Sequence, residues 1–339
     1  MRRILITGGA GFIGSHFVKL LVSEGYFVVS YDKLTYAGSL LNLKDVRDRE
    51  NFVFIKGDIT DRTHLKHIVE KYEVEGIANF AAETHVDRSI LNPEVFYETN
   101  IKGVFTLLEI ARTYNLRFLQ VSTDEVYGPC IYEPFHEDAP LHPTSPYAAT
   151  KASADLITLS YHKTFGLDVV ITRSSNNFGP FQYPEKFIPL VIMSLMEKRC
   201  IPIYGNGRQK RDWIYVKDNV IGIKEVLFRG KSGEVYNIRG GNEYENIELV
   251  KKIIDMYEEI TGTKGLDKLI SFVKDRPAHD IRYAISTQKI EKELGFHPTY
   301  RFNDALKETV KWYIEHPDWL NAMKNQDFKE YFRKNYKER

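Results

Sequence analysis

The sequence predicts an α/β protein in which a doubly wound parallel sheet is covered by a smaller C-terminal region. Short β-branched or aromatic runs alternate with longer amphipathic stretches through the first half of the chain. A glycine-rich segment joins the first run to the first amphipathic stretch. Beyond about residue 173 the alternation gives way to loops rich in Pro, Gly, Asn and aromatic residues. Strand and helix in strict alternation imply right-handed crossovers and helices on both faces of a parallel sheet.

Each element follows from its local pattern. Strands are expected at the short runs, residues 4–7, 27–31, 51–56, 76–81, 117–122 and 168–172. Helices are expected where apolar residues recur at helical spacing, at residues 13–24, 62–72, 93–114, 147–165, 216–228, 246–260 and 302–316. A length of 339 residues suits about two domains. We assign residues 1–175 to the sheet domain and 176–339 mainly to the second, and expect elements near 207–230 to return to the sheet.

Composition removes several classes of function. The chain has 47 Lys and Arg against 46 Asp and Glu, so its net charge of +1 gives no overall field to hold nucleic acid or an anionic membrane. Cys130 and Cys200 lie outside any metal-ligand spacing and suggest reduced thiols, with no metal site and no disulfide framework. Neither a signal peptide nor a long apolar run is apparent, so we expect a soluble, cytoplasmic protein.

A dinucleotide-binding motif follows the first predicted strand. Residues 8–14 read Gly-Gly-Ala-Gly-Phe-Ile-Gly and satisfy both GxxGxxG and GxGxxG. Glycines are needed there because the turn is tight and the backbone must approach a pyrophosphate, which then lies at the start of the next helix. Asp32 ends the second strand, where a carboxylate can bind ribose hydroxyls and repel a 2′-phosphate. The motif therefore predicts a Rossmann-type sheet that prefers NAD to NADP, although Lys33 weakens that preference slightly.

A tyrosine and a lysine mark the predicted reaction centre. Among 21 tyrosines only Tyr147 has a lysine four residues later, Lys151, and this spacing puts both side chains on one helix face. A nearby ammonium, aided by the positive nicotinamide ring, would lower the pKa of the phenol so that it can act as a base. Thr123 ends the preceding strand and can bind the same substrate oxygen. Together these residues resemble the extended short-chain dehydrogenase/reductase superfamily, which implies oxidation of a hydroxyl to a ketone by hydride transfer to NAD.

Two adjacent acids, Asp124 and Glu125, follow Thr123 directly and indicate a dehydration. A dehydration needs one group to remove a carbon-bound proton and another to protonate the departing hydroxyl. An NAD-dependent UDP-sugar epimerase or decarboxylase needs no such pair, so these activities are the alternative reading. A non-enzymatic NAD-binding scaffold would be indicated by loss of Tyr147, Lys151 or the acids, and all four residues are present.

Five segments carry a closer resemblance, namely residues 79–89, 122–128, 176–189, 211–216 and 276–280. They are similar to the dTDP-glucose 4,6-dehydratase family over nearly the whole chain. The resemblance implies oxidation at sugar carbon 4, loss of water across carbons 5 and 6, and return of the hydride to carbon 6, giving dTDP-4-dehydro-6-deoxy-glucose. It implies that Tyr147 is the base for the carbon 4 hydroxyl, Glu125 the base at carbon 5 and Asp124 the acid at carbon 6. It also implies tightly bound NAD and a homodimer through the 93–114 and 147–165 helices.

Matching the motifs residue by residue assigns the binding positions. For NAD they are Gly8, Gly11, Phe12, Ile13, Gly14, Asp32, Lys33, Leu34, Thr35, Asp58, Ile59, Phe80, Ala81, Ala82, Thr84, Thr99, Tyr147 and Lys151. For dTDP-glucose they are Thr84, Thr123, Asn176, Lys186, Phe187, Pro202, Tyr204, Arg211, Asn246, Arg276, His279 and Asp280. The lysine and two arginines suit a diphosphate. We interpret His85, Asp87 and Arg88 as structural and expect no metal. Ala278 stands where the family usually has glycine.

Overall fold

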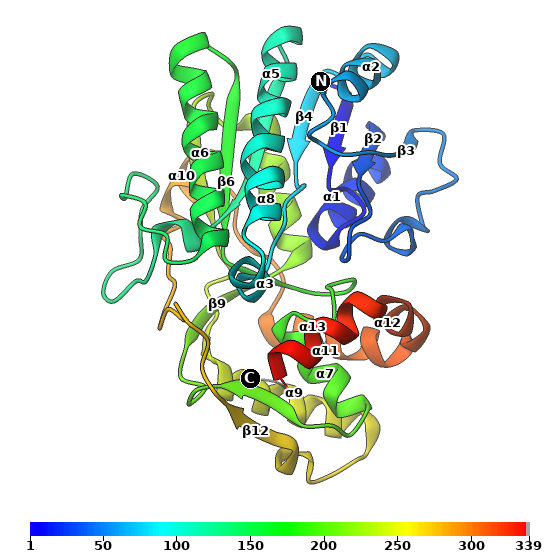
Figure 1. Cartoon of the computed structure of the whole chain (residues 1–339), viewed down its shortest axis with the longest axis vertical. Coiled ribbons are helices and arrows are strands. Elements are labelled where there is room, and N and C mark those ends of the chain that lie inside the picture. Colours follow the sequence, from blue (N-terminus) through cyan, green and yellow to red (C-terminus); the bar gives the residue numbers. More distant parts are fainter. Residues whose placement is uncertain (337–339) are drawn as a thin grey trace.

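The computed structural model describes residues 1–336 and is built on one large parallel sheet. Its seven strands lie in the order β10-β6-β5-β4-β1-β2-β3, and every neighbouring pair is parallel (Figure 1). The strands are β1 (Arg3–Thr7), β2 (Phe27–Asp32), β3 (Phe52–Lys56), β4 (Gly76–Asn79), β5 (Arg117–Thr123), β6 (Val169–Ser174) and β10 (Glu234–Ile238). The strand order reverses between β1 and β4, as in a doubly wound sheet, so the predicted fold class is confirmed.

Helices cover both faces of this sheet. On one face lie α1 (Phe12–Ser23) and α8 (Val216–Arg229), which pack against each other. On the other lie α2 (Arg62–Tyr72), α5 (Val104–Tyr114) and α6 (Pro146–Phe165). Strand β1 contributes side chains to the hydrophobic cores on both faces of the sheet. Ile4 and Ile6 belong to one apolar cluster, and Leu5 belongs to the other. A parallel sheet buried on both faces explains why its strands read as continuous apolar runs.

Parts of the sheet domain differ from the expected pattern. The predicted helix 93–114 is divided into α4 (Glu94–Tyr97), a π-helical segment η2 (Glu98–Gly103) and α5. Buried Asn100 lies in η2, and its side chain bonds both the N–H and the carbonyl of Glu83, at 2.9 and 3.0 Å. These bonds fix the wide turn against the loop after β4. A short helix, α3 (Val86–Leu91), and the seventh strand, β10, were not expected from local patterns.

The second region is assembled from smaller pieces at the carboxyl ends of the large sheet's strands (Figure 1). One sheet has the order β11-β9-β7, and β12 pairs in parallel with β8. The strands are β7 (Asn176–Phe178), β8 (Ile201–Tyr204), β9 (Lys210–Tyr215), β11 (Glu243–Glu245) and β12 (Ile270–Val273). The helices are α7 (Phe187–Met196), α9 (Asn246–Thr261), α11 (Phe302–Glu315), α12 (Pro317–Met323) and α13 (Gln326–Tyr336). Helix α10 (Gln288–Leu294) returns instead to the large-sheet domain, where it packs against α8 and β10 (Figure 1). Short turns of 3-10 helix form η1 (Leu40–Leu43), η3 (Asp124–Tyr127) and η4 (Leu266–Leu269).

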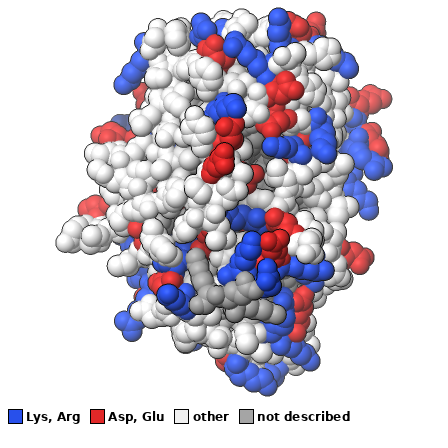
Figure 2. All heavy atoms as spheres, viewed as in Figure 1, with Lys and Arg blue, Asp and Glu red and all other residues white. Residues whose placement is uncertain are grey.

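The surface shows no single dominant charge. Figure 2 shows Lys and Arg interspersed with Asp and Glu on the face in view, in keeping with the net charge of +1. Within residues 1–336, none of the helices combines the length and the apolar character needed to cross a bilayer.

Candidate active site

Cavities meet at the carboxyl ends of the large sheet's strands, at the reversal of strand order where such sheets bind ligands. A cavity of about 260 Å³ extends from the glycine turn to the residues that follow β5. A smaller one, of about 100 Å³, lies beside the ends of β2 and β3. A third, of about 180 Å³, lies between η3 and the second region. Glu125 and Tyr147 line both the first and the third, so these two cavities adjoin at the predicted reaction centre.

The glycine turn has no room for side chains. Gly8 adopts φ +68°, a left-handed conformation that L side chains rarely take. A Cβ on Gly14 would collide with the Gly8 carbonyl. Gly11 is the residue before the first turn of α1, and its N–H donates to the Gly8 carbonyl at 3.1 Å. This close packing of turn, strand and helix leaves the start of α1 open to an anion.

Asp32 and Lys33 have partners that define the smaller cavity. Asp32 accepts hydrogen bonds from the N–H of Ala10 at 2.9 Å and of Leu34 at 2.8 Å, while burial raises the pKa of its carboxyl group. Lys33 forms a 2.7 Å ion pair with Asp58. The carboxylate offsets the positive charge by which Lys33 would otherwise favour the 2′-phosphate of NADP. Leu34 has φ 57°, and its N–H donates to the Asp32 carboxylate, so its backbone is held beside the smaller cavity while its side chain lines neither of these two cavities.

The remaining predicted cofactor residues line the first two cavities. The larger is lined by Gly8, Gly11, Phe12, Ile13, Gly14, Phe80, Ala82, Thr84, Tyr147 and Lys151. The smaller is lined by Gly8, Gly11, Asp32, Lys33, Thr35, Asp58, Ile59, Phe80, Ala81, Ala82 and Thr99. Sequence reasoning missed further lining residues, among them Ala37, Ser174, Ser175, Asn177, Gln182 and Tyr183. Small polar residues after a strand carry little signal, because they also form ordinary loops.

The tyrosine and lysine lie near the start of α6, as their spacing predicts. The Lys151 ammonium donates to the Val121 carbonyl at 2.6 Å, and burial lowers the pKa of this lysine to about 8. The pKa of the Tyr147 phenol is raised, first by burial and next by the charge of Glu125, while a hydrogen bond with Thr123 opposes the rise. The expected lowering of the tyrosine pKa by Lys151 is therefore not seen in the protein alone, because burial and a carboxylate outweigh it.

The acid pair lies in η3, the turn that follows β5. Thr123 caps this turn by accepting the Glu125 N–H at 3.3 Å, and its hydroxyl lies 3.3 Å from Asp124 Oδ1. Burial and the neighbouring Glu125 raise the pKa of Asp124 to about 8. Burial also raises the pKa of Glu125, but three cations oppose that rise, Arg276 most strongly, followed by Arg211 and Lys186. The two carboxyl groups therefore have different surroundings, as a division into acid and base requires.

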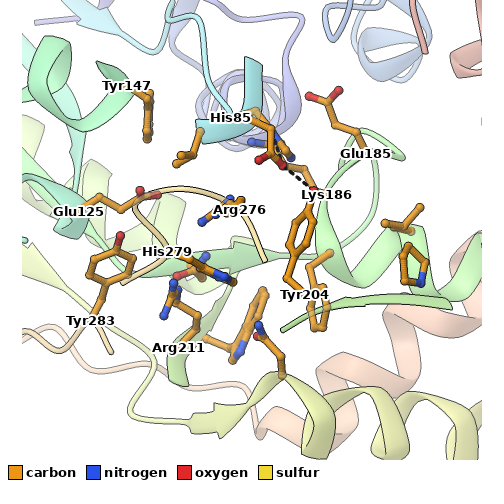
Figure 3. A pocket seen from close by; sticks show the side chains of 18 residues that line it. His85, Glu125, Tyr147, Glu185, Lys186, Tyr204, Arg211, Arg276, His279 and Tyr283 are labelled. Carbon is orange, nitrogen blue, oxygen red and sulfur yellow. Dashed lines mark hydrogen bonds and ion pairs between the residues drawn. The ribbon is translucent and has the colours of Figure 1, made fainter. Parts of the chain in front are cut away.

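The third cavity collects residues that are far apart in the sequence. Figure 3 shows Glu125, Lys186, Arg211 and Arg276 around one space, with the Tyr283 hydroxyl pointing toward the Glu125 carboxylate. Most of the predicted substrate residues line it, namely Asn176, Lys186, Phe187, Pro202, Tyr204, Arg211, Asn246, Arg276 and His279. The predicted residues Thr84 and Thr123 line the neighbouring cofactor-side cavity.

Asp280 is the predicted substrate residue that lines none of these cavities. Its carboxylate accepts hydrogen bonds from Thr144 at 2.5 Å and Tyr283 at 2.8 Å, and its carbonyl accepts one from Arg211 at 2.9 Å. Asp280 therefore holds Tyr283 and Arg211 in position. Nearby Ala278 has φ 51°, the left-handed conformation that explains why glycine is usual at this position.

Sequence reasoning also missed residues of the third cavity. His85, Val86, Asp87, Glu185, Leu190, Trp213 and Tyr283 line it. His85 and Asp87, which we interpreted as structural, thus face the cavity, whereas Arg88 pairs with Glu185 at 2.7 Å and Asp327 at 2.6 Å. Several of these residues lie inside the recognised motifs, so motif membership was the available signal. Among residues 1–336, no group of three or more His, Cys, Asp or Glu side chains is arranged to hold a metal ion.

Comparisons with known proteins agree with this geometry. A sequence model of the family described as GDP-mannose 4,6 dehydratase matches residues 5–309. The chain is 46% identical over 332 residues to the dTDP-glucose 4,6-dehydratase of Streptomyces niveus, covering 96% of each chain. It is 42% identical over 359 residues to that of Salmonella typhimurium, covering 99% of each.

Solved structures give the same result. The fold superimposes on DesIV, a dTDP-glucose 4,6-dehydratase of Streptomyces venezuelae with NAD and dTDP bound, with a TM-score of 0.90 at 44% identity, covering 95% of this chain and 99% of DesIV. It is also similar to a UDP-glucose 4-epimerase of Thermotoga maritima, with a TM-score of 0.84 at 30% identity, covering 93% and 99%. Identity is higher to the dehydratase, and η3 has the acid pair that a dehydration needs. The chain therefore belongs to the dTDP-glucose 4,6-dehydratase family of the extended short-chain dehydrogenase/reductase superfamily.

Proposed function

We propose that the protein converts dTDP-glucose to dTDP-4-dehydro-6-deoxy-glucose and water. The observation that carries this function is the position of the acid pair, in which Asp124 is buried and Glu125 is partly buried, where the cofactor-side and substrate-side cavities adjoin. An epimerase would need the tyrosine and lysine but not this pair. The curated relatives are named dTDP-glucose 4,6-dehydratases. Two similar solved structures, both of dTDP-glucose 4,6-dehydratases, contain NAD.

The cavities beside the glycine turn fit NAD. Gly8 and Gly14 leave a cradle that a Cβ would fill, and the start of α1 can bind the pyrophosphate. Asp32 and the Asp58–Ile59 pair lie where the adenosine half would bind. When bound, NAD supplies a hydride acceptor at sugar carbon 4 and a donor to carbon 6. We propose residues 1–175 as the domain for this cofactor and 176–339 mainly as the substrate domain, with α8 and β10 completing the first.

The chain's own residues then move the protons. Tyr147, as phenolate, takes the proton of the carbon 4 hydroxyl, while Lys151 supplies the neighbouring positive charge. Glu125 takes the carbon 5 proton, which the new ketone has made acidic, since the three nearby cations favour its ionised form. Asp124 gives a proton to the carbon 6 hydroxyl, which leaves as water, because a pKa of about 8 keeps this carboxyl group protonated at neutral pH. The two roles thus follow the two environments.

The substrate-side cavity fits a nucleoside diphosphate. Arg211 is buried, and Lys186 and Arg276 are partly buried, close to Glu125, so an anionic diphosphate would balance their excess positive charge. Pro202, Tyr204 and His279 line the same cavity and can contact the thymidine. Enclosure by the second region would keep water from the ketone while it exists.

Substrate conversion tests this proposal directly. The purified, NAD-loaded protein would be incubated in turn with dTDP-, UDP-, GDP- and CDP-glucose, and the products weighed by mass spectrometry. Loss of one water from dTDP-glucose, faster than from the other sugars, is the expected result. A change of sugar configuration at constant mass would establish epimerisation instead, and the absence of any turnover would favour the scaffold reading.

We also propose a homodimer through α4, α5 and α6. These helices, with α3, expose several large apolar side chains to solvent, including Leu91, Val95, Tyr97, Phe105, Leu156 and Phe165. Such side chains on neighbouring helices favour a protein–protein contact. Sedimentation at micromolar concentration should give the dimer mass, and a monomer would contradict the proposal.

The cytoplasm is the compartment we propose, because NAD and nucleotide sugars are intracellular metabolites, and cell fractionation tests it.

A further inference from the structure

Behind the tyrosine and lysine, the same face of α6 contributes the carboxylate of a buried ion pair. Asp155 lies four residues after Lys151, which puts it one helical turn further along that face. Its Oδ2 accepts a hydrogen bond from Arg173 Nε of β6 at 2.9 Å. Asp155 is fully buried and Arg173 is 2% exposed. Burial raises the pKa of Asp155, and that rise is opposed first by Arg173 and then by Lys151 and the Ser122 side chain.

Arg173 extends this pair to the turn that carries the acids. Its guanidinium donates to the Tyr127 hydroxyl at 2.8 Å and lies 4.7 Å from the centre of the Tyr127 ring. Tyr127 is the last residue of η3, the turn that contains Asp124 and Glu125. The Tyr127 hydroxyl in turn donates to Asn237 of β10 at 2.9 Å. The pair therefore connects α6, η3, β6 and β10 behind the reaction centre.

A buried ion pair is a weak source of stability. The cost of removing two charges from water roughly cancels their attraction, and apolar residues of similar size are often as stable. Stability therefore gives little reason for a carboxylate at this depth. The charge of Lys151 gives a better reason, since the lysine is buried and its ammonium donates to a neutral carbonyl, that of Val121.

The charges around Lys151 single out Asp155. Helix α6 contributes Tyr147 and Asp155, η3 contributes Asp124 and Glu125, and β6 contributes Arg173. Burial lowers the pKa of Lys151, and Asp155 opposes that fall. Asp124 is held mostly protonated at neutral pH, and Glu125 faces the three cations of the substrate cavity. Asp155 is thus the carboxylate positioned to balance the lysine.

We infer that Asp155 is a positioning residue for the oxidation step: Arg173 holds its carboxylate one turn behind Lys151, where it keeps the lysine ammonium charged. In that step the C4–H bond breaks, the hydride goes to NAD, and the hydroxyl proton goes to the Tyr147 phenolate. The products are the ketone, the reduced cofactor and the neutral phenol. Lys151 gives up no proton, so its charge must already be present. The link to oxidation rests on the proposed function, whereas the effect on Lys151 does not.

The effect on Lys151 can be measured without turnover. In protein with isotope-labelled lysine side chains, the Lys151 signal is assigned by its loss in Lys151→Met and then titrated by NMR. Asp155→Asn should lower the pKa of Lys151 by about one unit, the low end of the shift caused by an adjacent opposite charge. Asp155→Glu, which keeps the charge, should restore most of the shift. An unchanged pKa in Asp155→Asn overturns the inference.

Kinetics connects this shift to the reaction. Below its pKa Lys151 is charged, and the charge is lost as pH rises through the pKa. In Asp155→Asn the alkaline fall in the rate of cofactor reduction should therefore begin about one pH unit lower than in the wild type. Asp168→Asn is the matched control, because it breaks an Asp–Arg pair, with Arg117 at 2.7 Å, at the opposite end of β6. A uniform loss of rate with no shift would mean a structural role only.

Folding and function are separated by two further measurements. If Asp155→Asn does not fold, the double variant Asp155→Asn/Arg173→Met removes the buried pair together and is titrated instead. Lys151 must still titrate below its wild-type value there, and an unchanged value overturns the inference. If the wild type fails to reduce its cofactor with dTDP-glucose while Lys151 shifts as expected, the proposed function is wrong and the electrostatic coupling stands.

Discussion

Replacing Glu125 with Gln should separate the oxidation at carbon 4 from the loss of water. The carboxylate is buried beside Tyr147 and is proposed to take the carbon 5 proton. Gln has nearly the same shape but cannot accept that proton. Oxidation at carbon 4 does not need Glu125, so the variant should reduce its cofactor and then stop before water is lost.

The structure indicates the size of each effect. Loss of a general base slows its step by about 10²–10⁴-fold, equivalent to about 3–5 kcal/mol in activation free energy. Oxidation should stay within about tenfold of the wild type, since the charge of Glu125 raises the pKa of Tyr147 and its removal makes the phenol more acidic. Substrate binding should not weaken, because Lys186, Arg211 and Arg276 lose an internal counter-charge and remain free to bind the diphosphate.

The assay follows both steps in one experiment. Rapid mixing of Glu125→Gln with dTDP-glucose should give an increase in the absorbance of reduced nicotinamide that persists, while mass spectrometry detects no loss of water. Glu293→Gln is the matched control, because that glutamate lines none of the cavities and bonds Tyr236 at 2.9 Å. A variant that never reduces its cofactor would refute the assignment of Glu125 to elimination. So would normal formation of the dehydrated product.

Three other changes test the rest of the site. Tyr147→Phe should block cofactor reduction itself, by about 10²-fold or more, in the same rapid-mixing assay; a normal reduction would remove Tyr147 from the oxidation step. The pKa of Asp124 is raised to about 8, so the wild-type elimination rate should fall as pH rises through that value, because only the protonated acid can donate. Asp124→Asn should be slow at every pH and should not show this alkaline fall. If the variant still shows the fall, the titration belongs to another group. Gly14→Ala introduces a Cβ that collides with the Gly8 carbonyl, so it should lower both the free energy of unfolding, by about 1–3 kcal/mol, and the NAD content of the purified protein. Gly262→Ala controls for loss of stability alone, because φ +73° strains a side chain there while its Cβ meets nothing within 4 Å. Equal NAD content in both variants would contradict the proposed cradle.

The local features of the site could be predicted from the sequence because their physical causes are local. A glycine at position 14 is required by the contact between turn and helix, and the spacing of Tyr147 and Lys151 fixes a common helix face. Helix bounds at α2 agree with the prediction, and most others differ by one residue, since apolar spacing and end residues specify them. The π-helical break at Asn100 could not be predicted in this way, because its cause is a bond to the distant Glu83.

The convergence of the substrate cavity was accessible only through resemblance. Lys186 directly precedes α7, Arg211 lies on β9 and Arg276 lies in the segment after β12. No pattern within any of these segments indicates the others. Tyr283 lies outside the five motifs and lines the cavity without any sequence signal of its own. Asp280 shows the opposite case, because it belongs to a motif yet acts by holding Tyr283 and Arg211.

The sequence alone determined the fold class and the cofactor turn and predicted the reacting groups, because short-range sterics and residue spacing specify these features. Only the tertiary structure decided the environments in which those groups lie. Asp124 and Glu125 are chemically alike neighbours, and what separates them is burial together with cations brought from distant segments. The same holds for Lys151, whose charge depends on Asp155 and its Arg173 partner. Acidity in a folded protein reflects desolvation and neighbouring charge, and both exist only once the chain has folded.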